Sequence, residues 1–275
     1  MSEEAFGTVI LCGEWDRRTV PIAFGRNSMN VLFTGATGYS GIGMVEILSA
    51  HHIVRGADVV RKPSACREML VADITDYETC RSLVKGMDAM VLGHMAPNPD
   101  GYKLPAPAFD VNVKGTANLY HAAAEVGLKT VVLISSCGVL MNPQTPSTDA
   151  EVGVGPYRYG DGLYCLSKVM QEGIARHYFL QFGIATAVLR PSWIVYDGEL
   201  VTKYGEKMER YYSSLIDPRD IGRAIVAALA LPSLKLEAFN IGQDDLTADL
   251  TFAKTRLRWS PQHRFESLPR VNNGN

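Results

Sequence analysis

Tyr164 and Lys168 are the residues of this sequence whose types and spacing best fit proton-transfer chemistry. A separation of four residues places both side chains on one face of a helix. An ammonium group beside a phenol stabilises the phenolate, which predicts a lowered pKa for Tyr164. That would make the tyrosine a general acid and base for a carbonyl/alcohol couple. Of the 12 tyrosines, only Tyr164 is followed by a lysine four positions later.

Two serines, Ser135 and Ser136, follow the β-rich run Thr130–Ile134 upstream of this tyrosine. A hydroxyl at the end of a strand can hydrogen-bond a reacting oxygen, and open α/β sheets bind ligands beyond the carboxyl ends of their strands. The serine pair is therefore expected to lie near the substrate of Tyr164.

Three glycines, Gly35, Gly38 and Gly41, separate the β-rich run Asn30–Thr34 from a helical stretch that ends at about Ala50. The first permits a tight turn, the second lets the backbone approach a pyrophosphate, and the third lets helix and strand pack closely. The N-terminus of the helix offers unpaired N–H groups to an anion. We predict a dinucleotide site, with a structural glycine turn as the competing interpretation.

Asp58 lies 23 residues after the first of these glycines, where an acidic residue would hold the ribose hydroxyls of NAD. A solvated loop carboxylate is the competing interpretation. A cation at Arg55, Arg61 or Lys62 could instead accept a 2′-phosphate, so NAD is expected and NADP stays open. Asp73, after the next β-rich run, is placed to meet the adenine edge or to cap the following helix.

From Met29 onward, the chain alternates between β-rich runs and helical stretches, and these elements must position the residues named above. The alternation predicts an α/β fold with a parallel sheet covered on both faces. Strands are expected at Asn30–Thr34, His51–Ala57, Met69–Ala72, Ala89–Gly93, Thr130–Ile134 and Thr186–Leu189. Helices are expected after the glycine turn and at Thr75–Lys85, Ala108–Val126, Gly162–Phe182 and Asp220–Leu231.

The composition excludes several classes of protein. The chain has 275 residues, a net charge of −2 and five cysteines. No basic footprint for nucleic acid is present. The odd cysteine count without a C-x-x-C pair argues against a disulfide framework or a metal site and favours the cytoplasm. No apolar run approaches the roughly 18 residues of a membrane span. Residues 1–28 do not resemble a signal peptide and are interpreted as an N-terminal extension, or else a peripheral hairpin.

From Met29 to about Phe265 the chain resembles the extended branch of the short-chain dehydrogenase/reductase superfamily. The matching stretches, in order, are TGATGYSG, VADITD, FDVNVKGTANLYHAA, VVLISS, YCLSK, AVLRPSWIV and FNIG. The resemblance implies a Rossmann-type doubly wound parallel sheet over residues 29–190 that binds NAD(P). It also implies a small, interleaved substrate-binding region over residues 191–275, a sugar-type substrate and a homodimer formed through the two long helices.

The resemblance also implies roles for individual residues. Tyr164 would be the acid/base, Lys168 would hold the nicotinamide ribose, and Ser136, with Ser135 as the near alternative, would bind the reacting oxygen. The residues expected to contact the cofactor are Gly35, Thr37, Gly38, Tyr39, Ser40, Gly41, Asp58, Asp73, Ile74, Asn112, Tyr164, Lys168 and Pro191. The residues expected to contact the substrate are Ser136, Cys137, Ser192 and Arg210.

Some positions depart from the pattern of this branch. The family's tyrosine-glycine pair after the serine strand is Leu140-Met141 here, and a run of small residues after the fourth strand contains His94. This histidine would either face the cofactor or pack inside the fold. Cys137 and Cys165 follow the proposed catalytic serine and tyrosine and are interpreted as buried small residues rather than nucleophiles.

In this branch, large insertions after the position of Pro191-Ser192 normally build the cap that grips a nucleotide sugar. The segment 192–219 is only 28 residues long, so the resemblance implies a small free sugar rather than a nucleotide sugar. A closer resemblance is to the uronate dehydrogenases, in which an arginine near the position of Arg210 holds the sugar carboxylate. A solvated surface charge is the alternative for Arg210.

Other functions also stay open: an epimerase or dehydratase with tightly bound NAD, and a silent NAD(P)-sensing protein. The NAD(P)-sensing function is disfavoured, because proteins of that kind often lose the tyrosine or the lysine and both Tyr164 and Lys168 are present here.

Overall fold

The computed structural model describes residues 28–98, 101–140, 152–153, 157–158, 162–211, 215–245 and 248–269. Nearly all of the expected N-terminal extension, residues 1–27, lies outside these ranges. Within the described residues, no helix is long and apolar enough to cross a membrane.

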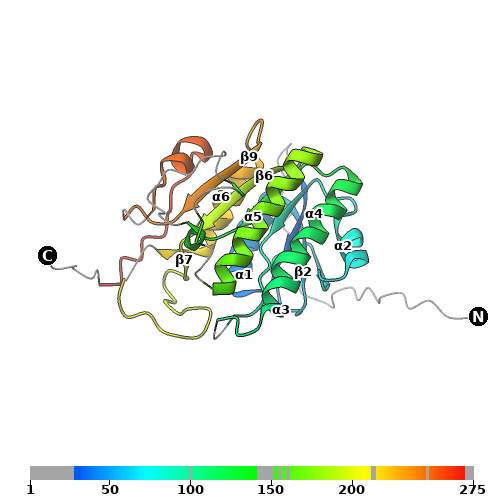
Figure 1. The fold of residues 1–275 in the computed structure, drawn as a ribbon. Helices are drawn as coiled ribbons and strands as arrows, with labels where there is room; N and C mark the ends of the chain where they lie inside the picture. Colours follow the sequence, from blue (N-terminus) through cyan, green and yellow to red (C-terminus); the bar gives the residue numbers. More distant parts are fainter. Residues whose placement is uncertain are drawn as a thin grey trace, which may run out of the picture.

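A seven-stranded parallel sheet forms the centre of the molecule (Figure 1). Its strands, in spatial order, are β3 (Glu68–Val71), β2 (Ile53–Asp58), β1 (Asn30–Thr34), β4 (Ala89–Leu92), β5 (Thr130–Ile134), β6 (Ala185–Pro191) and β9 (Leu236–Ile241). β1 lies inside the sheet and pairs with β2 on one side and with β4 on the other. β3 pairs with the far side of β2, so the chain crosses back over β1 to form β4. The strand order therefore reverses between β1 and β4, the position at which doubly wound sheets bind their ligands.

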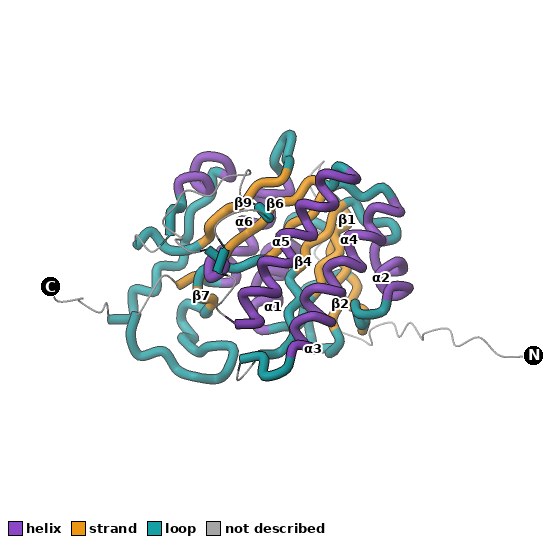
Figure 2. The backbone as a smooth tube through the Cα atoms, in the orientation of Figure 1, coloured by secondary structure: helices purple, strands orange, loops and turns teal. Residues whose placement is uncertain are grey.

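Helices cover both faces of this sheet. The helices are α1 (Tyr39–Ser49), α2 (Tyr77–Val84), α4 (Gly115–Val126), α5 (Gly162–Phe182) and α6 (Pro218–Leu229). Buried apolar side chains of α1 and α6 form one core cluster with the sheet, whereas those of α2, α4 and α5 contribute to a second. Figure 2 shows α4 and α5 side by side in front of the strands. The doubly wound prediction is confirmed.

Shorter helical segments connect these elements. They are α3 (Pro105–Pro107), the π-helical η1 (Ala108–Lys114), the 3₁₀ turn η2 (Cys137–Val139) and η4 (Ala253–Leu257). The stretch expected to be one helix at Ala108–Val126 is therefore η1 followed directly by α4. The helix expected at Asp220 begins at Pro218, because the Asp217 carboxylate caps it by accepting the Arg219 N–H.

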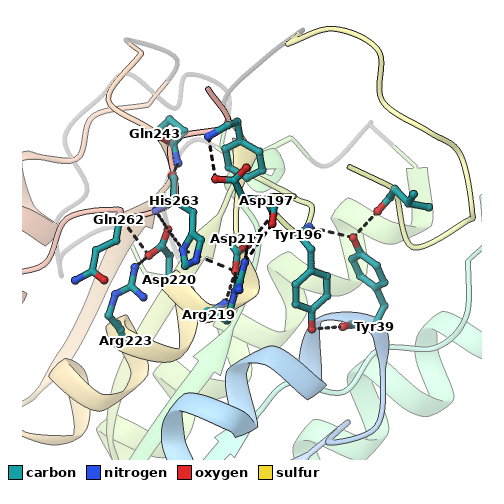
Figure 3. A network of polar contacts seen from close by, with 12 residues as sticks. Tyr39, Tyr196, Asp197, Asp217, Arg219, Asp220, Arg223, Gln243, Gln262 and His263 are labelled. Carbon is teal, nitrogen blue, oxygen red and sulfur yellow. Dashed lines mark hydrogen bonds and ion pairs between the residues drawn. The ribbon is translucent and has the colours of Figure 1, made fainter. Parts of the chain in front are cut away.

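The C-terminal region is interleaved with the sheet. β9 is the sheet's last strand, while β7 (Trp193–Ile194) and β8 (Leu215–Ile216) form a separate two-stranded parallel pair. Buried carboxylates fasten the final segment to α6 (Figure 3). Asp220 accepts the backbone N–H groups of Gln262 and His263, both at 3.0 Å. Asp217 accepts the N–H of Asp197 at 2.8 Å, which ties the segment after β7 to the same cluster.

Candidate active site

Two adjoining cavities, of about 490 and 580 Å³, lie at the carboxyl ends of the strands, where the strand order reverses. Both volumes are within the usual range for small-molecule sites. The first is lined by the glycine turn, Asp58, Asp73 and Ile74. The second is lined by Ser136, Tyr164, Lys168 and Pro191, among others. The first turn of α1 contributes to both walls, so the cavities form one continuous site.

The glycine turn has no room for side chains at its ends. Gly35 adopts a φ of +77°, and a Cβ there would lie 2.8 Å from the Gly93 carbonyl oxygen. A Cβ at Gly41 would lie 2.0 Å from the Gly35 carbonyl oxygen. Gly38 precedes α1 without any side-chain cap, and the first turn of the helix carries no acidic residue. The N–H groups at this helix end are thus available to an anion, which fits the diphosphate of a dinucleotide.

Asp58, at the end of β2, lies beside this turn and accepts the Thr37 N–H at 3.0 Å. Its position in the first cavity fits the ribose-binding role expected of it. Among the cations that could accept a 2′-phosphate, Lys62 lines the cavity, whereas Arg61 does not. Arg55 is turned away, because its guanidinium pairs with Glu68 at 2.7 Å.

The other wall of the cofactor cavity includes Asp73 and Ile74. Asp73 accepts the Thr75 N–H at 2.9 Å, so its carboxylate shapes the turn, and the residue lines the cavity. The cap of α2 is a different residue, Asp76, which accepts the Thr79 N–H at 2.7 Å.

Asn112 does not line either cavity in the structure, contrary to the direct cofactor contact expected of it. The Asn112 side chain is fully buried and makes its hydrogen bonds to other residues of the protein. The Asn112 amide oxygen accepts the Ala96 N–H at 2.8 Å, and its amide nitrogen donates to Ser167 Oγ at 3.0 Å. Asn112 therefore holds the loop after β4 against α5.

His94 is a buried packing residue with both ring nitrogens in hydrogen bonds. Thr116 Oγ1 donates its proton to the Asn112 carbonyl at 2.6 Å, so it accepts from His94 Nε2 at 3.1 Å. Nδ1 then accepts from Thr34 Oγ1 at 2.8 Å. Burial, together with the charge of Lys168, lowers the pKa of His94 to about 3, so the ring is neutral. His94 lines the cofactor cavity, but both of its ring nitrogens are already hydrogen-bonded within the protein.

Three side chains meet in the second cavity: Ser136 from the end of β5, and Tyr164 and Lys168 from the first turns of α5. Ser136 accepts the Gly138 N–H at 3.1 Å and hydrogen-bonds the Tyr164 side chain. Lys168 is almost fully buried, and its Nζ donates to the Ile134 carbonyl at 2.9 Å. A hydroxyl, a phenol and an amine thus share one cavity wall.

The pKa of Tyr164 differs from the prediction. Burial raises it to about 12, and the hydrogen bond from Ser136 opposes this only in part. The expected lowering by Lys168 is wrong for this structure, because the lysine amine is directed to the Ile134 carbonyl. The pKa of Lys168 is itself lowered to about 7, mainly by burial and also by the charge of Lys203.

Both Ser135 and Ser136 line the second cavity, but their hydrogen-bond partners differ. Ser135 Oγ donates to the buried Glu172 carboxylate at 2.6 Å. Arg190 pairs with the same carboxylate at 2.7 Å, and Tyr157 donates to it at 2.7 Å. Ser135 therefore belongs to a buried structural cluster, which leaves Ser136 as the hydroxyl beside Tyr164.

Of the residues expected to contact substrate, Ser136, Cys137 and Ser192 line the second cavity. Burial raises the pKa of the Cys137 thiol to about 11, which makes it a poor nucleophile. Arg210 is exposed and lines neither cavity, so the structure does not bring it to the site.

Sequence reasoning missed Lys203 and Tyr204, which line both cavities. It also missed Tyr196, which contacts Tyr39 edge to face at a centroid distance of 5.3 Å. The segment after Pro191-Ser192 carries no regular hydrophobic period, so the only available signal was its aromatic and basic composition.

Residues 31–217 match the model of the NAD dependent epimerase/dehydratase family. The chain belongs to this family. It is 27% identical to an L-arabinose 1-dehydrogenase (NAD(P)(+)) from Haloferax volcanii over 248 residues, 84% of this chain and 96% of that protein. It is 32% identical to a uronate dehydrogenase from Pseudomonas syringae pv. tomato over 168 residues, 58% of each chain.

A solved structure supports the same relationship. A variant of the uronate dehydrogenase from Agrobacterium tumefaciens, complexed with NAD, has a TM-score of 0.68, 25% identity and a coverage of 86% of each chain. The expected family, the Rossmann-type fold, the enzymatic nature of the chain and NAD as its cofactor are thereby confirmed. The glycine turn, Asp58 and the uncapped end of α1 are the features that fit NAD.

Proposed function

We propose that the chain oxidises a hydroxyl of a small free sugar, with NAD as the hydride acceptor. The observation that carries this proposal is the meeting of Tyr164, Ser136 and Lys168 in a cavity continuous with the nucleotide cavity. The proposal is supported by the short segment 192–219 and by sugar dehydrogenases among the relatives.

In this mechanism, Ser136 hydrogen-bonds the substrate hydroxyl, and Tyr164 removes its proton. When bound, NAD would supply the acceptor for the hydride that leaves the carbon bearing this hydroxyl. Tyr164 can accept the hydroxyl proton only as the phenolate, after its own proton has been lost to solvent. Burial raises the pKa of Tyr164 to about 12, so the phenolate fraction and the rate of oxidation should increase as the pH rises. Lys168, whose Nζ donates to the Ile134 carbonyl, would bind the nicotinamide ribose.

A uronate is the substrate class that we favour. The uronate dehydrogenases match the chain both in sequence and in structure. Arg210, the residue expected to hold a sugar carboxylate, is exposed in this structure. Carboxylate recognition by Arg210 would therefore require this segment to move toward the cavity. An Arg210→Ala variant should raise KM for a uronate but not for its neutral aldose, and equal effects would refute the role.

Further features support a cytoplasmic homodimer. Among the described cysteines, Cys66, Cys80 and Cys137 are free thiols, as is usual in a reducing compartment. Apolar side chains at the ends of α4 and α5 are exposed, with Val126 at 47% and Leu180 at 63% of full exposure. A dimer formed through these helices would cover them. Light scattering should give twice the chain mass, and a monomer would refute the dimer.

Incubation of the purified protein with NAD and a panel of uronates, neutral aldoses and sugar alcohols tests the proposed reaction. We expect net formation of NADH with uronates or another group of free sugars. The alternative, a nucleotide-sugar epimerase or dehydratase, would return the hydride within one turnover. It would show no net NADH, NAD retained through purification, and conversion of a nucleotide sugar.

A further inference from the structure

Residues 196–208, here called the strap, follow β7, and two of them, Lys203 and Tyr204, line both cavities. At one end, the Tyr196 N–H donates to Tyr39 Oη at 3.2 Å, and Tyr39 Oη donates to the Val201 carbonyl at 2.5 Å. Figure 3 shows Tyr39 and Tyr196 lying against each other. At the other end, Tyr204 Oη donates to the Asn98 carbonyl at 2.5 Å. The strap is thus fastened to α1 and to the loop after β4.

The tip of the strap is an ordered turn around the buried Thr202. Thr202 Oγ1 accepts the N–H groups of Tyr204 and Glu206, at 3.3 and 3.2 Å. The Thr202 N–H donates to the Glu206 carbonyl at 2.8 Å. Lys203 lies at this tip, and its Nζ is 4.8 Å from the centre of the Tyr204 ring. The turn and the ring together limit where the ammonium group can lie.

Lys203 lines both cavities, as do Tyr39 and Ser40 in the first turn of α1. Within the described part of the chain, no ion pair involves Lys203. Its charge is one of the causes that lower the pKa of Lys168, which places the ammonium within electrostatic reach of the catalytic cavity. The junction of the cavities is therefore bordered by a helix N-terminus and an unpaired cation.

We propose that Lys203 is a cofactor-binding residue that pairs with the diphosphate of NAD. The diphosphate would lie between the uncapped end of α1 and the strap, with partial positive charge on one side and the ammonium on the other. The strap would then cover the bound cofactor and position it against Tyr164. This proposal concerns the cofactor alone and does not depend on which sugar is oxidised.

Calorimetric titration of NAD, ADP-ribose and adenosine into the wild type and a Lys203→Met variant tests the pairing. NAD and ADP-ribose contain the diphosphate, whereas adenosine does not. We expect the variant to bind NAD and ADP-ribose about tenfold more weakly, as for loss of one charge-assisted contact, and adenosine unchanged. Lys203→Arg should retain most of the affinity.

The matched control is Lys207→Met, which removes an exposed charge from the same strap at a position that lines neither cavity. It should bind all three ligands as the wild type does, and thermal unfolding should be unchanged in both variants. Equal affinity of Lys203→Met and the wild type for ADP-ribose would overturn the proposal. An equal loss in Lys207→Met would also overturn it. A variant that affected only KM for an acidic sugar would assign Lys203 to the substrate instead.

Discussion

Two polar clusters meet at the carboxyl end of β5: one is built around a buried ion pair, and the other borders a cavity. In the buried cluster, the Glu172 carboxylate accepts from Ser135, Tyr157 and Arg190. In the cavity cluster, Ser136, Tyr164 and Lys168 border open space. Successive residues of an extended strand point to opposite sides, which explains why adjacent serines enter different clusters. The oxygens of the Glu172 carboxylate are occupied by protein partners, which indicates a structural role, whereas side chains that border open space are available to ligands.

The largest effect is expected from Tyr164→Phe, which removes the hydroxyl that moves the proton. We expect kcat to fall by about 10³–10⁴-fold, with the affinity for NAD within about twofold of the wild type. Tyr157→Phe is the matched control from the buried cluster, and its folded fraction should keep the wild-type kcat. Steady-state kinetics and calorimetry measure both quantities, and comparable losses of kcat in the two variants would remove the distinction between the clusters.

Glu172→Leu should act mainly on stability. The substitution leaves the Arg190 guanidinium buried without its carboxylate, so the free energy of unfolding should fall by about 3–5 kcal/mol. Glu172→Leu combined with Arg190→Met removes both charges and should recover part of that loss. Urea unfolding provides the measurement. A double variant less stable than the single one would argue against an unpaired charge as the cause.

Ser136→Ala should lower kcat by about 10²-fold, because the reacting oxygen loses a hydrogen-bond donor. Ser135→Ala should change kcat by less than about threefold and lower the free energy of unfolding by about 1 kcal/mol. The two variants differ by one position in the chain and should separate activity from stability. The reverse pattern would make Ser135 the catalytic hydroxyl.

The smallest effect concerns the pH dependence of stability. The pKa of Lys168 is lowered to about 7 in the folded state from 10.5, so between these values the unfolded chain binds a proton that the folded chain lacks. This group therefore makes stability rise with pH across that window. From pH 7 to 9, the wild type should gain about 2 kcal/mol relative to Lys168→Met. Equal slopes in urea titrations would mean that Lys168 stays protonated when folded.

Most of the fold followed from local sequence patterns, because strands β1, β2, β4, β5 and β6 are apolar runs beside clear turns. Within the seven-stranded sheet, the exception is β9, which was not predicted as a strand; the short strands β7 and β8 outside this sheet were not predicted either. The β9 sequence LEAFNI includes Glu237 and Asn240, residues unfavourable in strands. Both are held by tertiary partners: Arg256 pairs with Glu237 at 2.8 Å, and Asn240 donates to the Asp249 carbonyl. Contacts between residues that are separated in the sequence leave no local pattern from which a strand could be predicted.

The candidate site was predictable where main-chain geometry determines it, as at the glycine turn. The choice between the two serines was not, because it depends on Glu172 and Arg190, which approach only in the folded chain. The pKa of Tyr164 was mispredicted for a similar reason. The spacing of Tyr164 and Lys168 places them on one face, but burial and the Ile134 carbonyl determine their protonation.

Transfer of deuterium tests the central claim most directly. A sugar from the panel that turns over would be labelled at the carbon bearing the reacting hydroxyl and incubated with NAD and the wild-type protein. The NADH would then be analysed by mass spectrometry. The account predicts one deuterium in each NADH formed and no product from Tyr164→Phe. Unlabelled NADH, or labelled NADH formed equally well without the Tyr164 hydroxyl, would contradict it.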